Sequence, residues 1–449
     1  MGKLFGTDGI RGEANRYPMD GMTAFSVGQA VTHLIKKEKQ NAGIVIGRDT
    51  RISGNMLEHS LAAGIASMGG DPYLAGVLPT PGIAFTCRSM GAEAGIMISA
   101  SHNPYEDNGI KIFSGQGFKL SDREEEIIED LILNGRLPQM VPPAREIGRA
   151  ETIDHALDNY IAFLKECFPH DLSMKGIKIV IDTANGAAYR AAPALFAALG
   201  ADVDTIHHSP DGKNINHNCG SQFTQDLQAR VLQRGAAIGL AFDGDGDRLI
   251  AVDETGKAIT GDPIMLICAK VLKDLGRLKN DLVVSTVMSN LGFILACKKY
   301  GLKHHASRVG DRYVLEDMKR LGAVIGGEDS GHMIFVDHHT TGDGILAAIQ
   351  LIAAMLRLGK PLSNLAAMMD VYPQVLINVE VERKPEISTL PELTEAIRQT
   401  ETELGDEGRV LVRYSGTQNL CRVMVEGPTR HVTEKYCREI ADAVRRAIG

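Results

Sequence analysis

Short apolar runs alternate along the chain with longer segments that have one apolar face. The runs that predict buried strands lie at residues 43–47, 95–99, 177–181, 203–206, 238–242, 282–285 and 323–325. Helical periodicity follows several of these runs, at residues 54–68, 187–199 and 291–300. This alternation is typical of parallel α/β units. Ligands of such sheets bind beyond the carboxyl ends of the strands, so we expect function in the loops that follow the runs.

The pattern is interrupted at three places, which divide the chain into domains. A segment rich in Pro and Gly occupies residues 134–148, and softer breaks lie near residues 253–261 and 370–373. The part after the last break has a different order of strand, helix, two strands and helix. We predict an α/β protein of four domains, three related mixed-sheet α/β domains and a smaller C-terminal α+β domain, with boundaries at residues 1–148, 149–254, 255–369 and 370–449.

Composition narrows the class of protein. Hydrophobic residues make up 44% and charged residues 23% of the 449 positions, which is ordinary for a globular protein. The formal net charge of −8 argues against a sequence-independent grip on nucleic acid, which needs a basic face. A phosphate ligand stays compatible with it, because a few local Arg and Lys residues are enough to bind one.

Cysteine usage and the absence of long apolar segments indicate a cytoplasmic enzyme. The seven cysteines form no C-x-x-C pair, and their number is odd, which fits reduced thiols. The most apolar helical segment, residues 345–358, is shorter than the roughly 20 residues of a membrane span. We therefore expect a buried helix there and no membrane partner.

Three carboxylates stand at alternate positions directly after the strand predicted at residues 238–242. Asp243, Asp245 and Asp247 are separated by glycines, so the loop can fold around one small cation, and oxygen ligands favour Mg²⁺ or Ca²⁺. An acidic surface turn and a calcium EF-hand are the alternatives. The EF-hand is disfavoured, because Arg248 replaces its glycine and a strand-like segment follows.

Ser101 follows another predicted strand and is a candidate nucleophile. A Ser-His-Asp hydrolase built from Ser101, His102 and Asp107 is one reading, but neighbours in sequence rarely meet in triad geometry and no G-x-S-x-G motif exists. In the other reading Ser101 is phosphorylated and the Asp cluster holds Mg²⁺ against its phosphate. Lys111 would then supply a cation or move a proton.

Two further polar loops occur, each compatible with an ordinary turn. Residues 326–332 (GGEDSGH) offer carboxylates and hydroxyls that suit a sugar, and residues 413–419 with Arg422 offer a plausible phosphate cradle. Each predicted domain thus carries one such loop. Nucleophile, metal site, hydroxyl site and phosphate site together are what phosphoryl transfer to a sugar requires.

The four loops SASHNP (99–104), DGDGDR (243–248), GGEDSGH and RYSGT (413–417) resemble the signature loops of the α-D-phosphohexomutase superfamily, in order and spacing. The resemblance covers nearly the whole chain. The stretches FGTDGIRG (5–12), IGRDTRISG (46–54) and PDGKNINHNCGS (210–221) are similar to those of bacterial members that act on glucosamine phosphate.

The resemblance implies an isomerase with four domains around a central cleft. It also suggests a homodimer. It implies that Ser101 is the phosphoserine and that Asp243, Asp245 and Asp247 bind Mg²⁺ together with it. The other implied site residues are Arg11, His102 and Lys111 for catalysis, Arg248, Glu328 and Ser330 for the transfer site and the sugar, and Arg413, Ser415, Gly416, Thr417 and Arg422 for the phosphate that stays.

The implied reaction interconverts glucosamine 6-phosphate and glucosamine 1-phosphate through a 1,6-bisphosphate, with a hexose 1,6-bisphosphate as primer, and supplies UDP-N-acetylglucosamine and cell-wall synthesis. Two departures from the family pattern touch substrate choice. Gln418-Asn419 replace the usual Glu-Pro, and Asp329 replaces a common Gln. A sister mutase for glucose or mannose phosphate and a weakened paralogue with a regulatory role are therefore the alternatives.

Overall fold

The computed structural model describes residues 4–6, 8–38, 42–415 and 419–449. The chain forms two compact units, one of Met1–Val287 with Lys303–Ala367 and the other of Met288–Leu302 with Met368–Gly449. No helix in these described ranges combines the length and apolar character that crossing a membrane requires.

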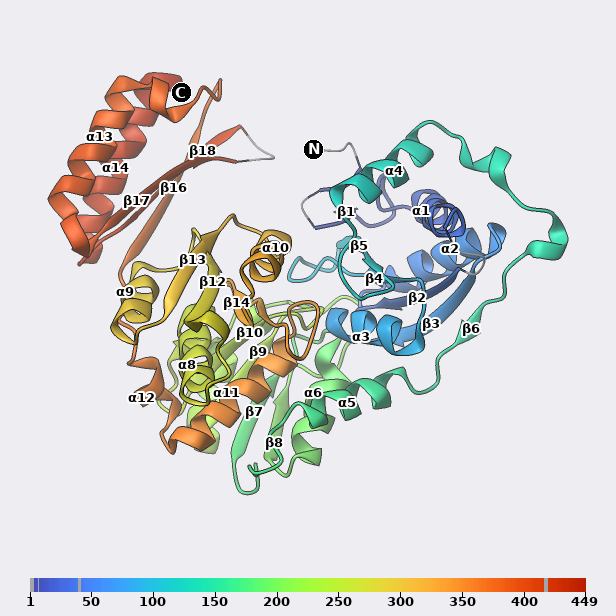
Figure 1. Ribbon diagram of the computed structural model, residues 1–449, viewed down its shortest axis with the longest axis horizontal. Helices are drawn as coiled ribbons and strands as arrows, with labels where there is room; N and C mark the ends of the chain where they lie inside the picture. Colours follow the sequence, from blue (N-terminus) through green and yellow to red (C-terminus); the bar gives the residue numbers. More distant parts are fainter. Residues whose placement is uncertain (1–3, 7, 39–41, 416–418) are drawn as a thin grey trace. The chain divides into compact units, whose positions relative to one another are not determined.

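The first sheet of the larger unit has parallel strands at its centre and an antiparallel pair at one edge. Its strands lie in the order β1 (Ile10–Glu13), β5 (Asp107–Ser114), β4 (Ala94–Ile98), β2 (Gly43–Arg48), β3 (Asp71–Val77) and β6 (Glu151–Thr152). Figure 1 shows α3 (Thr80–Met90) on one face, and α1 (Gly21–Lys36), α2 (Gly54–Ser67) and α4 (Asp122–Leu133) on the other. Gly47 permits the close approach of α3, because a Cβ there would lie 2.1 Å from Ile83 Cδ1.

The second and third sheets follow along the chain. The second has the strands β11 (Ala258–Ile259), β10 (Leu249–Asp253), β9 (Ile238–Phe242), β7 (Lys178–Asp182) and β8 (Asp202–Ile206), with helices α5 (Ala156–Glu166), α6 (Ala188–Ala198) and α7 (Gln225–Arg234). The third has β13 (Lys303–Ser307), β12 (Leu282–Thr286), β14 (Ile325–Gly327) and β15 (Met333–Phe335), with α8 (Gly261–Asp274), α10 (Asp311–Leu321), α11 (Gly344–Leu358) and α12 (Leu362–Ala366).

All three sheets share one topology. Each sheet contains a set of four strands with the same arrangement: β3-β2-β4-β5, β8-β7-β9-β10 and β13-β12-β14-β15. Within a set, the strand that comes first in sequence (β2, β7 or β12) lies between the second and the third, and both are parallel to it. The fourth strand pairs antiparallel with the third. The prediction of three related mixed-sheet domains is therefore confirmed. The turn between the third and the fourth strand of each set carries one of the polar loops: the serine loop (residues 99–104), the aspartate loop (243–248) and the predicted sugar loop (326–332).

The strand predicted at residues 323–325 begins two residues later, at Ile325. The reason is local: Ala323 N–H still donates to Met318 O and closes the end of α10, so its backbone is not free to pair with β12. The segment predicted as a linker, 134–148, contains two short 3₁₀ turns, Leu137–Met140 and Ala144–Glu146. The domain boundaries stay predictions; β6 and β11 lie just beyond two of them and belong to the preceding sheets.

The smaller unit is an antiparallel sheet covered on one face by two helices. Its strands lie in the order β16 (Gln374–Glu380), β18 (Leu420–Glu426) and β17 (Arg409–Tyr414), and α13 (Pro391–Leu404) and α14 (Arg430–Ile448) cover it, as Figure 1 shows. This is the predicted order of elements. The unit also includes α9 (Leu291–Lys299), although α9 follows β12 in sequence. Buried Glu426 joins it to the sheet, because its carboxylate accepts from Leu291 N–H and from Arg409.

Candidate functional site

The serine loop and the aspartate loop meet in the larger unit. Ser101 follows β4, is 1% exposed, and donates from its Oγ to Asp243 Oδ2 over 2.6 Å. Its backbone φ is +52°, in the left-handed region that residues other than Gly seldom adopt. The contact brings together the predicted nucleophile and the first predicted metal ligand, from two different sheets.

The β9–β10 turn packs its three carboxylates into a small volume. Ligand oxygens of Asp243, Asp245 and Asp247 all lie within 4.8 Å of one another, and all three residues are buried. Glycine is required at position 244, because a Cβ there would lie 2.5 Å from Ser101 O. Burial, and after it the neighbouring charges of Asp247 and Asp245, raise the pKa of Asp243 well above its ordinary value.

The cluster fits a small divalent cation. Asp245 Oδ1 and Asp247 Oδ1 are buried, and neither has a hydrogen-bond partner among the described residues. Buried carboxylate oxygens are costly unless something compensates them. A hard cation with oxygen ligands would satisfy both atoms and offset the mutual repulsion of the three charges.

Lys111 of β5 is the fixed cation of this site. Its Nζ lies 2.9 Å from Asp245 Oδ2, 3.3 Å from Asp8 Oδ2 and 3.7 Å from Asp247 Oδ2. Burial alone would lower the pKa of this ammonium, but Asp245, Asp8 and Asp247 together raise it above its ordinary value. Of the two roles that the sequence left open for Lys111, the geometry favours the cation over the proton carrier.

The charges around Lys111 continue as a chain that alternates in sign. Lys119 Nζ contacts both Asp8 and Asp311, the second at 2.5 Å. His332 Nε2 lies 3.6 Å from Asp311, and its Nδ1 lies 3.4 Å from Asp247. The alternation explains how so many charges are buried together, since each anion has a cation beside it.

His102 and two arginines stand beside the serine. His102 Nδ1 lies 3.3 Å from Ser101 Oγ, and burial, followed by the charges of Arg248 and Arg11, lowers the pKa of His102 to about 4. Arg11 pairs with Asp8. Arg248 Nε lies 3.8 Å from Asp247 Oδ1 and is buried without a hydrogen-bond partner in the described part of the chain.

The sugar loop lies directly against the aspartate loop. Arg248 forms an isolated backbone bridge with His332, and Leu249 N–H donates to Gly331 O over 3.0 Å. Glu328 Oε1 accepts from Gly310 N–H at 3.0 Å, and the exposed Ser330 donates to Glu328 Oε2 at 3.4 Å. The carboxylate of Glu328 and the hydroxyl of Ser330 therefore lie next to the aspartate loop.

Asp329, one of the two departures from the family pattern, has a local structural role. Its Oδ1 accepts from Asp262 N–H over 3.1 Å in the first turn of α8, whose N-cap residue Thr260 makes no side-chain cap. A carboxylate at this end of a helix is favoured by the helix dipole. The extra anion of this loop is thus occupied with the helix, at least through one of its oxygens.

The predicted phosphate loop belongs to the smaller unit. Arg413 of β17 and Arg422 of β18 are direct cross-strand partners, and burial followed by the charge of Arg422 lowers the pKa of Arg413. Arg422 Nε is buried without a hydrogen-bond partner among the residues that are described. Ser415 N–H donates to Leu420 O. Gly416, Thr417 and Gln418 lie outside the described residues.

Comparison with known proteins identifies the family. Family models of phosphoglucomutase/phosphomannomutase match this chain, with α/β/α domains I, II and III on residues 2–138, 158–256 and 260–372 and the C-terminal domain on residues 376–443. A phosphoglucosamine mutase of Syntrophobacter fumaroxidans is 69% identical over 449 residues, 100% of both chains. The chain belongs to the phosphoglucosamine mutase family.

Two solved structures have the fold of this phosphohexomutase. A phosphoglucomutase/phosphomannomutase family protein from Burkholderia thailandensis superposes with a TM-score of 0.81 at 23% identity, over 99% of this chain and 97% of that one. N-acetylphosphoglucosamine mutase of Aspergillus fumigatus, solved with GlcNAc-6P and magnesium, gives a TM-score of 0.72 at 17% identity, over 99% and 96%.

Within this mutase, sequence reasoning named the groups at the centre of the buried charge cluster, Ser101, the three aspartates and Lys111, and missed several of those around them. Asp8, Lys119 and Asp311 complete the charge chain, although they are far apart in sequence: Asp8 and Lys119 lie outside the named strands and helices, and Asp311 begins α10. The available signal was the family resemblance, because Asp8 lies in the stretch FGTDGIRG (5–12) and Asp311 in the stretch VGDRYVLE (309–316), which both support it. The structure thus adds the compensating charges around the three carboxylates, which it brings together.

A second group of metal-ligand types lies in the second domain, at Asp182, His207 and Cys219. Hydrogen bonds account for the carboxylate: Asp182 accepts from Ala184 N–H and Gly220 N–H at 2.9 Å, and its Oδ2 lies 3.0 Å from His207 Nδ1. Burial raises the pKa of the Cys219 thiol to about 12, so this thiol stays protonated at neutral pH. Hydrogen bonds and ion pairs thus account for Asp182 and His207 in the fold, and we assign the group no part in the reaction.

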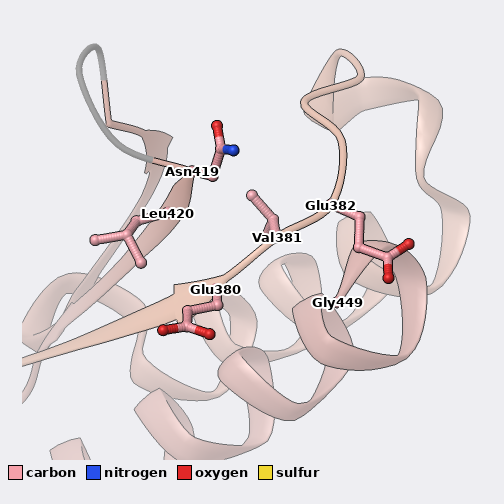
Figure 2. A pocket seen from close by; sticks show the side chains of 6 residues that line it. All are labelled: Glu380, Val381, Glu382, Asn419, Leu420 and Gly449. Atoms are coloured by element: carbon pink, nitrogen blue, oxygen red, sulfur yellow. The ribbon is translucent and has the colours of Figure 1, made fainter.

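A cavity of about 590 Å³ lies in the smaller unit, lined by Glu380, Val381, Glu382, Asn419, Leu420 and Gly449. Figure 2 shows Val381 pointing toward Asn419, whereas the carboxylates of Glu380 and Glu382 point to opposite sides. The polar groups do not converge on a common point, and their charge is wrong for a phosphate. We therefore assign no part of the transfer reaction to it.

Proposed function

We propose that this protein interconverts glucosamine 6-phosphate and glucosamine 1-phosphate, using Ser101 as a phosphoserine and glucosamine 1,6-bisphosphate as the intermediate. The observation that carries the proposal is the 2.6 Å contact between Ser101 Oγ and Asp243 in a buried cluster of three carboxylates. The names of its relatives support the amino-sugar substrate. The product would feed UDP-N-acetylglucosamine and cell-wall synthesis.

The metal ligands in this proposal are Asp243, Asp245 and Asp247, joined by a phosphoryl oxygen on Ser101. Their donor set suits Mg²⁺, and the magnesium in the Aspergillus fumigatus complex supports this choice of ion. The ion, when bound, neutralises charge that develops on the transferring phosphoryl group. Lys111 contributes a second, permanent positive charge from the protein itself.

In the first half-reaction the phosphoryl group leaves Ser101 for the free sugar hydroxyl. The phosphorus–Oγ bond breaks, a phosphorus–oxygen bond to the sugar forms, and the proton of that hydroxyl ends on Ser101 Oγ. His102, which is neutral at pH 7 and lies 3.3 Å from Oγ, is the side chain placed to pass this proton. Glu328 and Ser330 hold sugar hydroxyls, and Arg11 and Arg248 face the charge of the transferred group.

In the second half-reaction Ser101 recovers the other phosphate of the turned bisphosphate. The phosphate that stays is held by Arg413, Ser415 and Arg422, with Gly416 and Thr417 from the same loop. This cradle has to accept a phosphate from either end of the sugar. A hexose 1,6-bisphosphate serves as primer, because it restores the phosphate on Ser101 when the intermediate escapes. A homodimer and a cytoplasmic location stay predictions.

The test compares kcat/KM for glucosamine 6-phosphate with that for glucose 6-phosphate, with Mg²⁺ and a trace of glucose 1,6-bisphosphate. We expect a clear preference for the amino sugar, and phosphate on Ser101 by mass spectrometry of the purified protein. A preference for glucose 6-phosphate would make the protein a sister mutase. Folded protein that turns over neither sugar would contradict the proposal.

A further inference from the structure

The main-chain oxygen of Ser101 receives two side-chain donors from two different domains. Arg51 Nη2, from the first domain, donates to Ser101 O over 2.9 Å, and Asn216 Nδ2, from the second, donates to it over 2.8 Å. Both donors also reach Asn103 O, each at 2.9 Å. A carbonyl has two lone pairs, and here two donors from different domains use them.

Arg51 is itself fixed on every side. It is 1% exposed, its Nε donates to Asp49 Oδ2 over 2.8 Å, and its Nη1 donates to Pro104 O. Asp49 in turn accepts from Ser99 Oγ, and Ser99 Oγ accepts from Ser101 N–H at 3.0 Å. Hydrogen bonds therefore hold both the N–H and the C=O of Ser101, and a planar guanidinium is well suited to serve several acceptors at once.

The conformation that these bonds hold is one that serine does not prefer. At a φ of +52°, the Cβ of a residue comes too close to the following carbonyl oxygen, so residues other than Gly disfavour this conformation. Such a conformation persists only where the surroundings determine it. Rotation of Ser101 to a negative φ would turn its carbonyl away from Arg51 and Asn216, and would move Oγ from its position 2.6 Å from Asp243.

We propose that Arg51 and Asn216 are positioning residues for phosphoryl transfer, acting as a clamp on the Ser101 carbonyl that aims Oγ at the aspartate cluster. The inference rests on the proposed function for its kinetic readout. Neither side chain bonds Oγ, so both act through the backbone. Because Asn216 belongs to the domain that carries the metal ligands, the clamp also keeps nucleophile and ligands in register.

Glycine substitution at Asn216 tests the clamp, with Asn185 as a matched control. Both asparagines are buried in the second domain and have positive φ, +60° and +48°, so Gly removes either side chain without backbone strain. The Asn185 side chain bonds only to its own domain in the described contacts, to Asn214 O and from Ser209 N–H. Asn185→Gly should therefore loosen the domain without releasing Ser101.

For Asn216→Gly we expect kcat to fall about 100-fold, the effect of a misplacement near 1 Å, with KM little changed. In single turnovers, the phosphoryl group of Ser101 should go to water more often, relative to sugar, than in the wild type. Asn185→Gly should keep both the wild-type kcat and the wild-type partition. Asn216→Asp, which keeps the shape but presents an acceptor to two carbonyls, should lower kcat further than Asn216→Gly.

Hydrogen exchange gives a readout that does not depend on the reaction. Amides of residues 99–106 should exchange faster in Asn216→Gly than in the wild type, and at the wild-type rate in Asn185→Gly. Equal loss of kcat in the two Gly variants, or exchange and partition unchanged in Asn216→Gly, would overturn the clamp. A wild type inactive on both sugars would overturn the proposed function, while the exchange data would still decide the clamp.

Discussion

The transfer site around Ser101 and the arginine pair of the C-terminal domain handle charge in opposite ways. In the first, anions and cations alternate, with Lys111 between Asp8 and Asp245. In the second, Arg413 and Arg422 face each other across two strands, and neither lies within ion-pair distance of a carboxylate in the part of the chain that is described. Around Ser101 the protein's own side chains balance the negative charges, whereas the arginine pair carries positive charge without a neighbouring carboxylate among the described residues.

The difference matches what each site has to hold. In the proposed mechanism the phosphoserine and its cation stay with the protein throughout a catalytic cycle, so fixed and buried partners are useful there. In the same proposal, the arginine pair holds the phosphate of the sugar, which arrives, leaves and changes ends. Like charges opposite each other on a sheet destabilise the empty state, and an anionic ligand removes that cost when it binds. The ligand thus supplies the compensation that the fold itself supplies around Ser101.

The largest effect on activity is expected at Ser101, because the proposed mechanism of the transfer site depends on its Oγ atom. Ser101→Ala removes the nucleophile and should abolish turnover, while circular dichroism and the melting temperature stay close to those of the wild type. Ser89→Ala, which changes a hydroxyl bonded only locally to Thr86 O, should keep full activity. Measurable mutase activity in purified Ser101→Ala would remove the basis of the phosphoserine mechanism.

Removing one carboxylate of the cluster should separate activity from stability. Asp243→Asn takes away a metal ligand, so kcat should fall by at least about 100-fold, and added Mg²⁺ should no longer raise the melting temperature. The metal-free variant should be no less stable than the metal-free wild type, because asparagine avoids both the burial of a charge and the repulsion by Asp247 and Asp245 that raise the pKa of Asp243. The exposed Asp171→Asn serves as control; equal Mg²⁺ stabilisation of Asp243→Asn and wild type would contradict the ligand assignment.

The arginine pair should respond in KM rather than in fold. Arg422→Met keeps the length of the side chain but removes its charge, so we expect KM to rise about tenfold or more, as loss of a charge-assisted hydrogen bond implies. Without ligand, the variant should be as stable as the wild type or gain roughly 0.2–1 kcal/mol. Thermal shifts with inorganic phosphate measure both effects. A loss of stability in Arg422→Met with KM at the wild-type value would show that Arg422 has a structural role and does not bind phosphate. Arg438→Met, at an exposed position of α14, is the control.

The smallest effect on activity is expected at Asp343, where the prediction concerns stability and tests the buried charges of the larger unit. Burial raises the pKa of Asp343 to about 6, although bonds from Leu346 N–H and Tyr160 lower it in part. The folded state therefore favours the protonated acid, and this stabilisation is present below about pH 4 and lost as pH rises through about 6. Asp343→Asn should flatten the pH dependence of the free energy of unfolding across this window by about 3 kcal/mol.

Urea unfolding between pH 4 and 7 measures this slope, with Asp442→Asn on the exposed face of α14 as control. An unchanged slope in Asp343→Asn would mean that Asp343 is ionised in the fold at every pH tested. Activity should change least in this variant, because Asp343 caps α11 and asparagine can also cap a helix.

Much of the fold was readable in advance. The apolar run at residues 238–242 coincides with β9. The helix predicted at residues 291–300 corresponds to α9, which ends one residue earlier, at Lys299. The strand at residues 323–325 was placed too early, because a local pattern does not reveal that the backbone of Ala323 completes the end of α10. The assignment of α9 to the C-terminal unit was equally invisible, since it depends on the contacts of Glu426.

The sequence by itself determined the strands, their polar loops and the three carboxylates at alternate positions, because these are properties of neighbouring residues. Only the tertiary structure decided which groups compensate them. Arg51 and Asn216 meet the carbonyl of Ser101 from 50 and 115 positions away, and Lys119 reaches Asp311 across 192 positions. A hydrogen bond or ion pair forms between groups that packing brings within about 3 Å. Spacing along the chain carries no record of that packing, so Ser101 could be proposed as the nucleophile from its loop, but the residues that bind its carbonyl could not be named.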